Sequence, residues 1–214
     1  MNGFPPQVDM DLEGWRLFWA RLEVTGDAAK AVLAGLRKAV EERIRATHAA
    51  GELSRHPTAA AVRGLFRRAG CDPTRYRPSS EALLRRVLRG ESLPAIHPLV
   101  DLNNCLSVEL VVPCCVMAEG SVAPPFTLRA GRPGESMTSL RGAFDLEGKP
   151  LLADAVGPFG TPITDSERVK VLSDTVRAWL VAYLPEGVVD ERCAAGALKA
   201  LIDEAPAARV VPMA

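Results

Sequence analysis

The first half of the chain carries apolar residues at the spacing of amphipathic helices. Apolar side chains recur every three or four positions in successive segments, with polar residues between them. This spacing places the apolar side chains on one face of a helix. Asp27 is a candidate N-cap for the first helix and Ser79 or Ser80 for the third, while Gly70 and Gly90 would end the second and third. The predicted helices span residues 27–50, 57–69, 79–89 and 99–110.

The second half of the chain has a different sequence pattern, in which short runs of β-branched residues alternate with Gly and Pro. Glu147-Gly148 predicts a tight hairpin link between two of these runs. The loop from Gly157 to Pro162 contains too many breakers for a helix or a strand. Asp190 is the predicted N-cap of a last helix. The predicted strands span residues 111–117, 126–130, 143–146, 150–153, 168–172 and 178–184.

Residues 15–24 fit both periods. Trp15, Phe18 and Trp19 would share one face of a helix, whereas Phe18, Ala20 and Leu22 would share one face of a strand. The segment ends in Val-Thr-Gly, which favours the strand.

Helices followed by strands indicate an α+β fold, with the N-terminal helices packed on a mixed or antiparallel sheet. No segment has the composition of an interdomain linker. We therefore expect one domain over residues 15–205, a flexible N-terminal segment over residues 1–14 and a frayed tail over residues 206–214.

Positive charge is concentrated in one part of an otherwise neutral chain. The formal net charge of the 214 residues is zero, yet the stretch from Arg55 to Arg89 contains nine arginines and only two acids, Asp72 and Glu81. Such a local excess is typical of a surface that meets phosphates. The alternative is a solvated helix face, and charge alone leaves both interpretations open.

Cysteine use and hydropathy limit the class of protein. There are five cysteines, an odd number without a CxxC pair, and the adjacent Cys114 and Cys115 would point to opposite sides of a strand. We therefore expect no metal site and no cofactor. No apolar run approaches the ~18 residues of a membrane span, and the start of the chain lacks the features of a secretory leader. These observations predict a cytoplasmic protein that does not enter a membrane.

Two polar features interrupt apolar surroundings and are the candidate site. Asn103 and Asn104 lie within an apolar helix, where they either cap neighbouring backbone or hold a ligand. The breaker-rich loop from Gly157 to Pro162 leads into Asp165, and its free backbone N–H groups could bind a developing oxyanion. No local motif of a nucleophilic hydrolase, a phosphate-binding loop or a zinc protease is present.

Several short motifs, in fixed order over about residues 15–205, resemble stand-alone B3/4-domain proteins. These are relatives of the editing domain in the β subunit of bacterial phenylalanyl-tRNA synthetase. The motifs are YRPSSEALLRRVL at 76–88, LP at 93–94, LVDLNN at 99–104, TLRA at 127–130, GE at 134–135, LAD at 152–154, FGTP at 159–162 and DSER at 165–168.

The resemblance implies an α+β fold with a central mixed or barrel-like sheet. It also implies an aminoacyl-tRNA deacylase, a hydrolase that cleaves the ester of a mischarged tRNA in translation quality control. Some stand-alone relatives remove the arginine analogue canavanine from tRNA-Arg. Asn103 and Asn104 fall on the Thr-Asn pair that lines the synthetase pocket. Cys115 stands where the synthetase has a histidine, a departure that removes any basis for carrying over its tyrosine specificity. The pocket glutamate falls near Asp165 to Glu167, and the spacing does not choose between these acids.

The resemblance assigns the following roles. The catalytic residues would be Asn104 together with Asp165 or Glu167, without metal or cofactor. The substrate-binding residues would be Asn103, Cys115, Gly157, Phe159, Gly160, Thr161 and Ser166. The tRNA-binding residues would be Arg75, Arg77, Arg85, Arg86 and Arg89.

Two other functions remain open from the sequence. The first is a non-catalytic tRNA-binding or synthetase-associated module, which needs the basic surface but no pocket. The second is a small-molecule binder or unrelated hydrolase that has kept only the fold. The sequence does not specify the amino acid, the tRNA or the oligomeric state.

Overall fold

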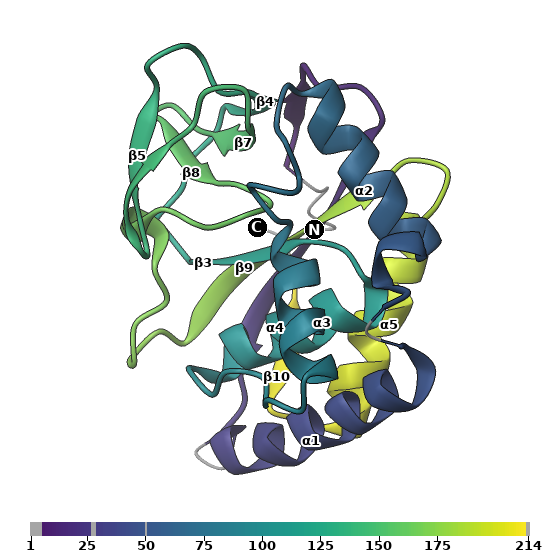
Figure 1. Cartoon of the computed structure of the whole chain (residues 1–214). Helices are drawn as coiled ribbons and strands as arrows, with labels where there is room; N and C mark the ends of the chain where they lie inside the picture. The colour runs from purple at the N-terminus through teal and green to yellow at the C-terminus, as the bar shows by residue number, and fades with distance from the viewer. Residues whose placement is uncertain (1–5, 27–28, 50, 213–214) are drawn as a thin grey trace.

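The computed structural model describes residues 6–26, 29–49 and 51–212. Within them the chain is an α+β domain in which sheets and helices pack in layers (Figure 1). The predicted cap Asp27 and the predicted helix end at residue 50 lie outside the described residues. The first helix, α1, spans Ala29–Thr47.

The central sheet has the strand order β10-β2-β9-β3, and all of its neighbouring strands are antiparallel. The strands span Ala208–Val211 (β10), Trp15–Val24 (β2), Arg177–Pro185 (β9) and Cys114–Ala118 (β3). The strand interpretation of residues 15–24 is therefore confirmed.

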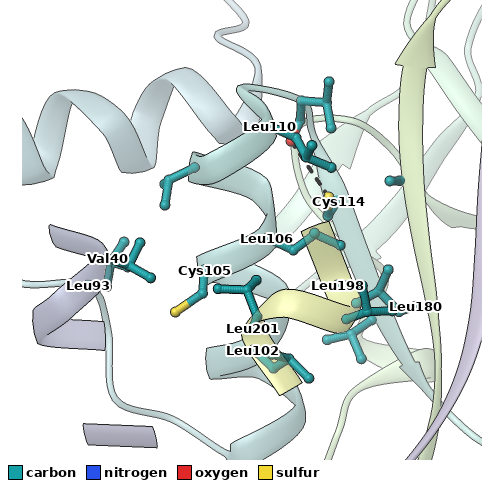
Figure 2. Close-up of a cluster of buried hydrophobic side chains, with 14 of the residues drawn as sticks. Val40, Leu93, Leu102, Cys105, Leu106, Leu110, Cys114, Leu180, Leu198 and Leu201 are labelled. Atoms are coloured by element: carbon teal, nitrogen blue, oxygen red, sulfur yellow. Dashed lines mark hydrogen bonds between the residues drawn. The ribbon is translucent and has the colours of Figure 1, made fainter. Parts of the chain in front are cut away.

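The two faces of this sheet bury different cores, because successive residues of a strand point to opposite faces. Ala20, Leu22 and Leu180 pack on the helical side, against α1, α4 (Pro98–Leu110) and α5 (Glu191–Glu204). Figure 2 shows Leu102 and Leu106 of α4 beside Leu180 and beside Leu198 and Leu201 of α5.

The other face of the sheet carries Trp15, Trp19, Val181 and Tyr183, which pack on α2 (Pro57–Arg68) and on a second sheet. Because both faces of β2 are covered, its apolar residues do not alternate cleanly. This double burial is the physical reason why residues 15–24 matched two periods.

The second sheet has the order β1-β4-β7-β8, in which β1 runs parallel to β4 and the other pairs are antiparallel. Its strands span Val8–Met10, Phe126–Ala130, Pro150–Ala153 and Pro158–Gly160. A hairpin of β5 (Ser136–Ser139) and β6 (Gly142–Asp145) lies beside it. The sheets of the described residues do not close into a barrel, so the barrel-like expectation was wrong.

Helix α4 is the most deeply buried helix that borders the central sheet. Eleven of its 13 residues are buried, including Asp101, Asn103 and Asn104. It begins after His97, whose Nδ1 accepts a hydrogen bond from the Leu99 N–H at 3.2 Å. It ends at Val111, whose φ of 59° lies in the left-handed region that β-branched residues rarely adopt, and this turn leads the chain directly into β3.

Helix α3 spans Ser79–Leu88, and 3₁₀ turns occur at Leu53–Arg55 and Glu167–Val169 (η2). Pro78, rather than Ser79 or Ser80, is the N-cap of α3, and no side chain within residues 6–26, 29–49 and 51–212 caps it. Residues 168–172, predicted as a strand, start within the 3₁₀ turn instead.

Other local predictions failed where strand pairing decided the structure. Residues 158–160 form β8 although breakers surround them, because β7 supplies a partner. Glu147-Gly148 does not link a hairpin, since β6 pairs with β5 whereas β7 pairs with β4 and β8. Both segments predicted to be loose contain strands, β1 near the start and β10 near the end of the chain.

None of the described helices combines the length and the apolar composition that crossing a lipid bilayer requires.

Candidate functional site

A cleft of about 730 Å³ lies where α3 and α4 face the β5–β6 hairpin and the loop that follows β8. We call it the α4 cleft. Among the residues that line it are Asn103, Asn104, Cys114, Thr161 and Asp165. It thus brings together the two polar features that lie about 60 positions apart in the sequence.

Helix α4 contributes buried polar side chains to the cleft, and these differ in whether their hydrogen-bonding atoms have partners. Asn103 and Asn104 are 5% and 9% exposed, and the Asn103 Oδ1 atom is buried without a hydrogen-bond partner among the described residues. Asp101, one turn away from Asn104, is fully engaged, because it forms a salt bridge with Arg37 and accepts a hydrogen bond from the Ile96 N–H at 2.9 Å. An unpaired buried acceptor is costly, so the Asn103 oxygen is suited to a ligand that carries hydrogen-bond donors.

Asp165 is the acid of the cleft. Its backbone is held by a β-bridge to Gly160 and by a hydrogen bond from the Leu140 N–H to the Asp165 carbonyl at 3.0 Å. Its Oδ1 atom is buried without a hydrogen-bond partner among the described residues. Burial raises the pKa of this carboxyl from 3.8 to about 8. At neutral pH the free protein therefore holds Asp165 mainly in its protonated form.

Gly160 makes room for the Asp165 carboxyl. A Cβ atom at position 160 would lie 3.4 Å from Asp165 Oδ1, 3.4 Å from the Tyr183 hydroxyl and 3.6 Å from Cys115 Sγ. A methyl group at position 160 would therefore just touch the Asp165 carboxyl, and any larger side chain would displace it.

The turn between β8 and Asp165 is fixed by Thr161, which is buried. The Thr161 hydroxyl donates to the Thr164 carbonyl at 2.7 Å and accepts from the N–H groups of Ile163 and Thr164 at 3.1 and 2.9 Å. These local hydrogen bonds satisfy the Thr161 hydroxyl within the turn, so its evident role is to shape the cleft wall.

The β3 wall presents Cys114 to the cleft instead of the predicted Cys115. Cys114 and Val116 belong to the helical side of the central sheet, while Cys115 and Met117 face the opposite core. Cys115 Sγ donates a long hydrogen bond of 3.8 Å to the Tyr183 hydroxyl. Burial raises the pKa of both thiols well above the usual value, so neither is a ready thiolate nucleophile.

Cations surround the mouth of the cleft. Arg77, which projects near the start of α3, has no salt bridge to a described residue, whereas Arg86 and Arg89 share Glu91. Arg75 also lines the cleft, with its guanidinium 5.1 Å from the centroid of the Tyr76 ring. Of the residues predicted to bind tRNA, Arg85 is the exception, because it lies outside the lining and is turned toward the buried Glu81.

The opposite side of the mouth carries two cations that the sequence analysis missed. Arg141 lies at the tip of the β5–β6 hairpin and Lys170 follows η2; both are exposed and have no salt bridge to a described residue. They lie in separate loops without a charge run or a motif, so no sequence signal marked them. Asp165 is the only acid among the described residues that line the cleft.

The remaining predicted site residues lie outside the cleft lining. Glu167 is exposed, Phe159 is fully buried against Phe126 with ring centroids 5.9 Å apart, and Ser166 caps η2 through its hydroxyl. Gly157 lies in the turn after β7 and accepts a hydrogen bond from Arg168. Of the two candidate acids, the fold therefore brings only Asp165 to the cleft.

In residues 6–26, 29–49 and 51–212, the His, Cys, Asp and Glu side chains form no group of three suited to a metal ion. The groups that the cleft offers to a ligand are the buried oxygens of Asn103 and Asp165, the Asn104 amide and the surrounding cations. Such a set can bind a cationic or donor-rich group inside and an anionic group at the mouth.

Comparisons with known proteins identify the family. The B3/4 domain profile matches residues 61–196, which include α3, α4, β3, the β5–β6 hairpin and Asp165. Among solved structures, an N-terminal fragment of the phenylalanyl-tRNA synthetase β subunit from Pyrococcus horikoshii aligns over 98% of this chain, with a TM-score of 0.46 and 14% sequence identity. This chain covers 54% of that fragment, or about half its length. No curated protein sequence gives a significant match. Since the family profile covers most of the chain, the protein belongs to the B3/4 domain family.

Proposed function

We propose that this B3/4 domain protein hydrolyses the ester bond of a mischarged aminoacyl-tRNA. The observation that carries the proposal is that one cleft combines a cationic mouth with two buried oxygens that have no hydrogen-bond partner in the described part of the chain. An aminoacyl-tRNA has the complementary groups, because its α-ammonium donates hydrogen bonds and its backbone is a polyanion. The motifs in the sequence that resemble editing-domain relatives support the same substrate.

Asp165 and Asn103 are the proposed ligands of the substrate ammonium. The raised pKa of Asp165, about 8, is close to that of an α-amino group, roughly 7.7 to 8.0. A nearby cation favours the charged form of a carboxyl, so ammonium binding would convert Asp165 to the carboxylate. The resulting ion pair would fix the ester in the cleft.

The Asn104 amide is the proposed donor for the ester carbonyl. In hydrolysis a water oxygen attacks the carbonyl carbon, the ester C–O bond breaks and a proton from the water passes to the departing ribose oxygen. A positioned donor stabilises the negative charge that develops on the carbonyl oxygen. The aminoacyl ester is already activated, so holding ester and water in place can suffice without a covalent nucleophile.

The cations on both sides of the mouth are the proposed contacts for the tRNA backbone. Arg77, Arg86 and Arg89 lie on the α3 side, with Arg141 and Lys170 on the hairpin side. Neutralising phosphates releases condensed counterions, which makes the affinity dependent on salt. We assign no nucleic-acid role to Arg85, because it is turned toward Glu81.

A deacylation panel tests the proposal. The purified protein is mixed with tRNAs charged with near-cognate and non-protein amino acids, including canavanyl-tRNA-Arg and tyrosyl-tRNA-Phe. We expect one amino acid to be released well above the buffer rate, and correctly charged tRNA to be spared. Asn104→Ala should lower the rate by about 10²- to 10³-fold, the typical cost of losing an oxyanion donor.

The role of the Asp165 carboxyl in activity is tested by comparing Asp165→Asn with the control variant Asp203→Asn. Asp203 is an exposed carboxyl on α5, remote from the lining of the cleft. Activity should fall in the first variant and remain in the second. Full activity in both Asn104→Ala and Asp165→Asn would remove the site assignment. Tight binding of uncharged tRNA without hydrolysis of any panel member would instead indicate a non-catalytic tRNA-binding module.

A further inference from the structure

A carboxylate with a fully buried side chain directly follows strand β7. The Asp154 side chain is 0% exposed and accepts hydrogen bonds from the N–H groups of Ala123, Val156 and Gly157 at 3.2, 3.0 and 3.1 Å. Burial alone would raise the pKa of Asp154, but these donors and the guanidinium of Arg168 outweigh it and lower the pKa overall. Asp154 is therefore a charged carboxylate whose oxygens already have hydrogen-bond and ion-pair partners, and it can hold neighbouring segments in place.

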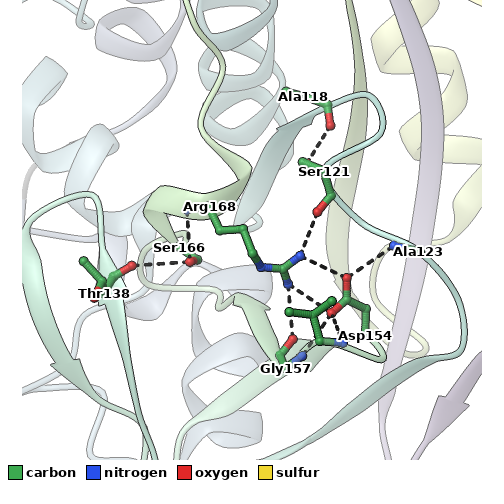
Figure 3. Close-up of polar contacts among 9 residues, drawn as sticks. Ala118, Ser121, Ala123, Thr138, Asp154, Gly157, Ser166 and Arg168 are labelled. Carbon is green, nitrogen blue, oxygen red and sulfur yellow. Dashed lines mark hydrogen bonds and ion pairs between the residues drawn. The ribbon is translucent and has the colours of Figure 1, made fainter.

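Arg168 connects this carboxylate to the segment that carries Asp165. Its guanidinium donates to both Asp154 carboxylate oxygens, at 3.0 and 3.2 Å, and to the carbonyls of Ser121 and Gly157 at 2.7 and 3.4 Å (Figure 3). One side chain thus joins η2 to the end of β7, the β7–β8 turn and the β3–β4 loop. The rigid fork of a guanidinium is suited to such simultaneous contacts.

The segment between Asp165 and Arg168 is short and fixed at both ends. The Ser166 N–H donates to the Phe159 carbonyl at 2.9 Å, and the Ser166 hydroxyl donates to the Thr138 carbonyl and accepts from the Arg168 N–H, each at 3.3 Å. Asp165 itself faces the α4 cleft, whereas neither Arg168 nor Asp154 lines it. A change at Arg168 would therefore reach the cleft through the protein, along this segment or along β8 from Gly157 to Gly160, and not by contact with a ligand.

We propose that the Arg168–Asp154 ion pair is a positioning device that holds the Asp165 side chain in place at the α4 cleft. Arg168 acts through the backbone of residues 165–168 and does not touch the substrate. The inference deepens the proposed function, since it assigns a residue that sets the geometry of the same site. The placement of Asp165, however, can be measured without substrate.

The surroundings of Asp165 determine what its release would do. The titratable groups that face it are the Cys114 and Cys115 thiols from β3 and the Tyr183 hydroxyl from β9, all of which have raised pKa values and stay neutral at neutral pH. The charged groups in the same lining include Arg141 and Lys170. Freeing the segment would admit water to the carboxyl and return its pKa toward 3.8, because burial is the cause of its rise.

The experiment compares Arg168→Ala with Arg129→Ala. Arg129 on β4 forms a similar two-point pair with Glu135, at 2.6 and 2.7 Å, but its partner is not tied to the Asp165 segment. The midpoint of Asp165 titration is followed by carboxyl-carbon NMR in the free protein, and stability is followed by urea unfolding. We expect both variants to lose stability, and only Arg168→Ala to lower the Asp165 midpoint, by at least about one pH unit, the tenfold change in proton affinity that one unit represents.

Arg168→Lys keeps the charge but replaces the fork with a single ammonium, so it provides a milder variant if Arg168→Ala does not fold. Its midpoint should lie between those of the wild type and the alanine variant. Unchanged midpoints in the folded Arg168 variants would overturn the proposal, whatever their stability. If the wild type hydrolyses no aminoacyl-tRNA but the midpoint still shifts, the proposed function fails and the positioning role stands.

Discussion

The Asp165 side chain, which is half-buried with its Oδ1 atom fully buried, predicts how the stability of this protein depends on pH. The side chain has a pKa of about 8 in the folded protein, against 3.8 in the exposed state, because burial disfavours its charged form. Between these two values the unfolded chain has released the proton while the folded protein keeps it. Raising the pH through this window therefore favours unfolding, and replacing Asp165 with Asn should remove the dependence.

The size of this pH dependence follows from the one proton that the folded protein keeps and the unfolded chain releases. A difference of one bound proton changes the free energy of unfolding by about 1.4 kcal/mol per pH unit. From about pH 5 to about pH 8, the stability of Asp165→Asn should therefore rise relative to the wild type by as much as roughly 4 kcal/mol. The change should level off above the folded-state pKa, where both states have lost the proton. The isosteric amide keeps the shape of the cleft, so packing adds little to this difference.

Urea unfolding at four or five pH values within this window measures the effect, with linear extrapolation to water. Asp203→Asn is the control, because it makes the same substitution at an exposed carboxyl on α5 that does not line the cleft. A constant difference between Asp165→Asn and the wild type across the window would refute the reasoning. It would mean that water reaches the carboxyl and that Asp165 titrates as an ordinary aspartate.

Three further changes test other parts of the structure. Leu106→Ala should cost about 2 to 5 kcal/mol of unfolding free energy, because it leaves a cavity in the fully buried packing of α4; urea unfolding would check this. Arg37→Ala should cost about 3 to 5 kcal/mol in the same assay, since it removes the partner of the buried Asp101 carboxylate. Arg141→Ala should weaken tRNA binding and reduce the slope of log affinity against log salt by about one, as measured by fluorescence anisotropy. An unchanged slope would place Arg141 outside the tRNA contact.

Local signals in the sequence predicted most of the secondary structure. The apolar period and the stop signals located α2, α3 and α4, and the Asp190 cap of α5 is confirmed by its hydrogen bond from the Cys193 N–H at 2.7 Å. These predictions succeeded because a helix satisfies its hydrogen bonds within a local segment. The strands that failed, β1, β5, β8 and β10, are short. The partners of β1 and β10 are distant in the sequence, so no local pattern reveals them. The partners of β5 and β8 are the adjacent strands β6 and β7, but β5 is mostly polar and β8 lies among Gly and Pro, so neither shows a strand pattern.

The composition of the cleft was predicted only in part. Asn103 and Asn104 stood out because they are polar within an apolar helix, and Asp165 stood out because it follows a breaker-rich loop. The prediction that Cys115 lines the cleft was off by one residue, because neighbouring residues of a strand point to opposite faces of the sheet and Cys114 is the one on the cleft side. Only the pairing of β3 with β9 decides which cysteine faces α4.

The α+β class, the helix positions and the ordered motifs that resemble the B3/4 family can be predicted from the sequence alone, because they depend on residue type and local spacing. The tertiary structure alone decided that Asp165 and not Glu167 reaches the cleft, that Arg141 and Lys170 complete its mouth, and that Arg85 turns toward Glu81. It also tied Arg168 to Asp154. These relations depend on which strands pair and which helix faces are covered, so they exist only after distant segments have packed together.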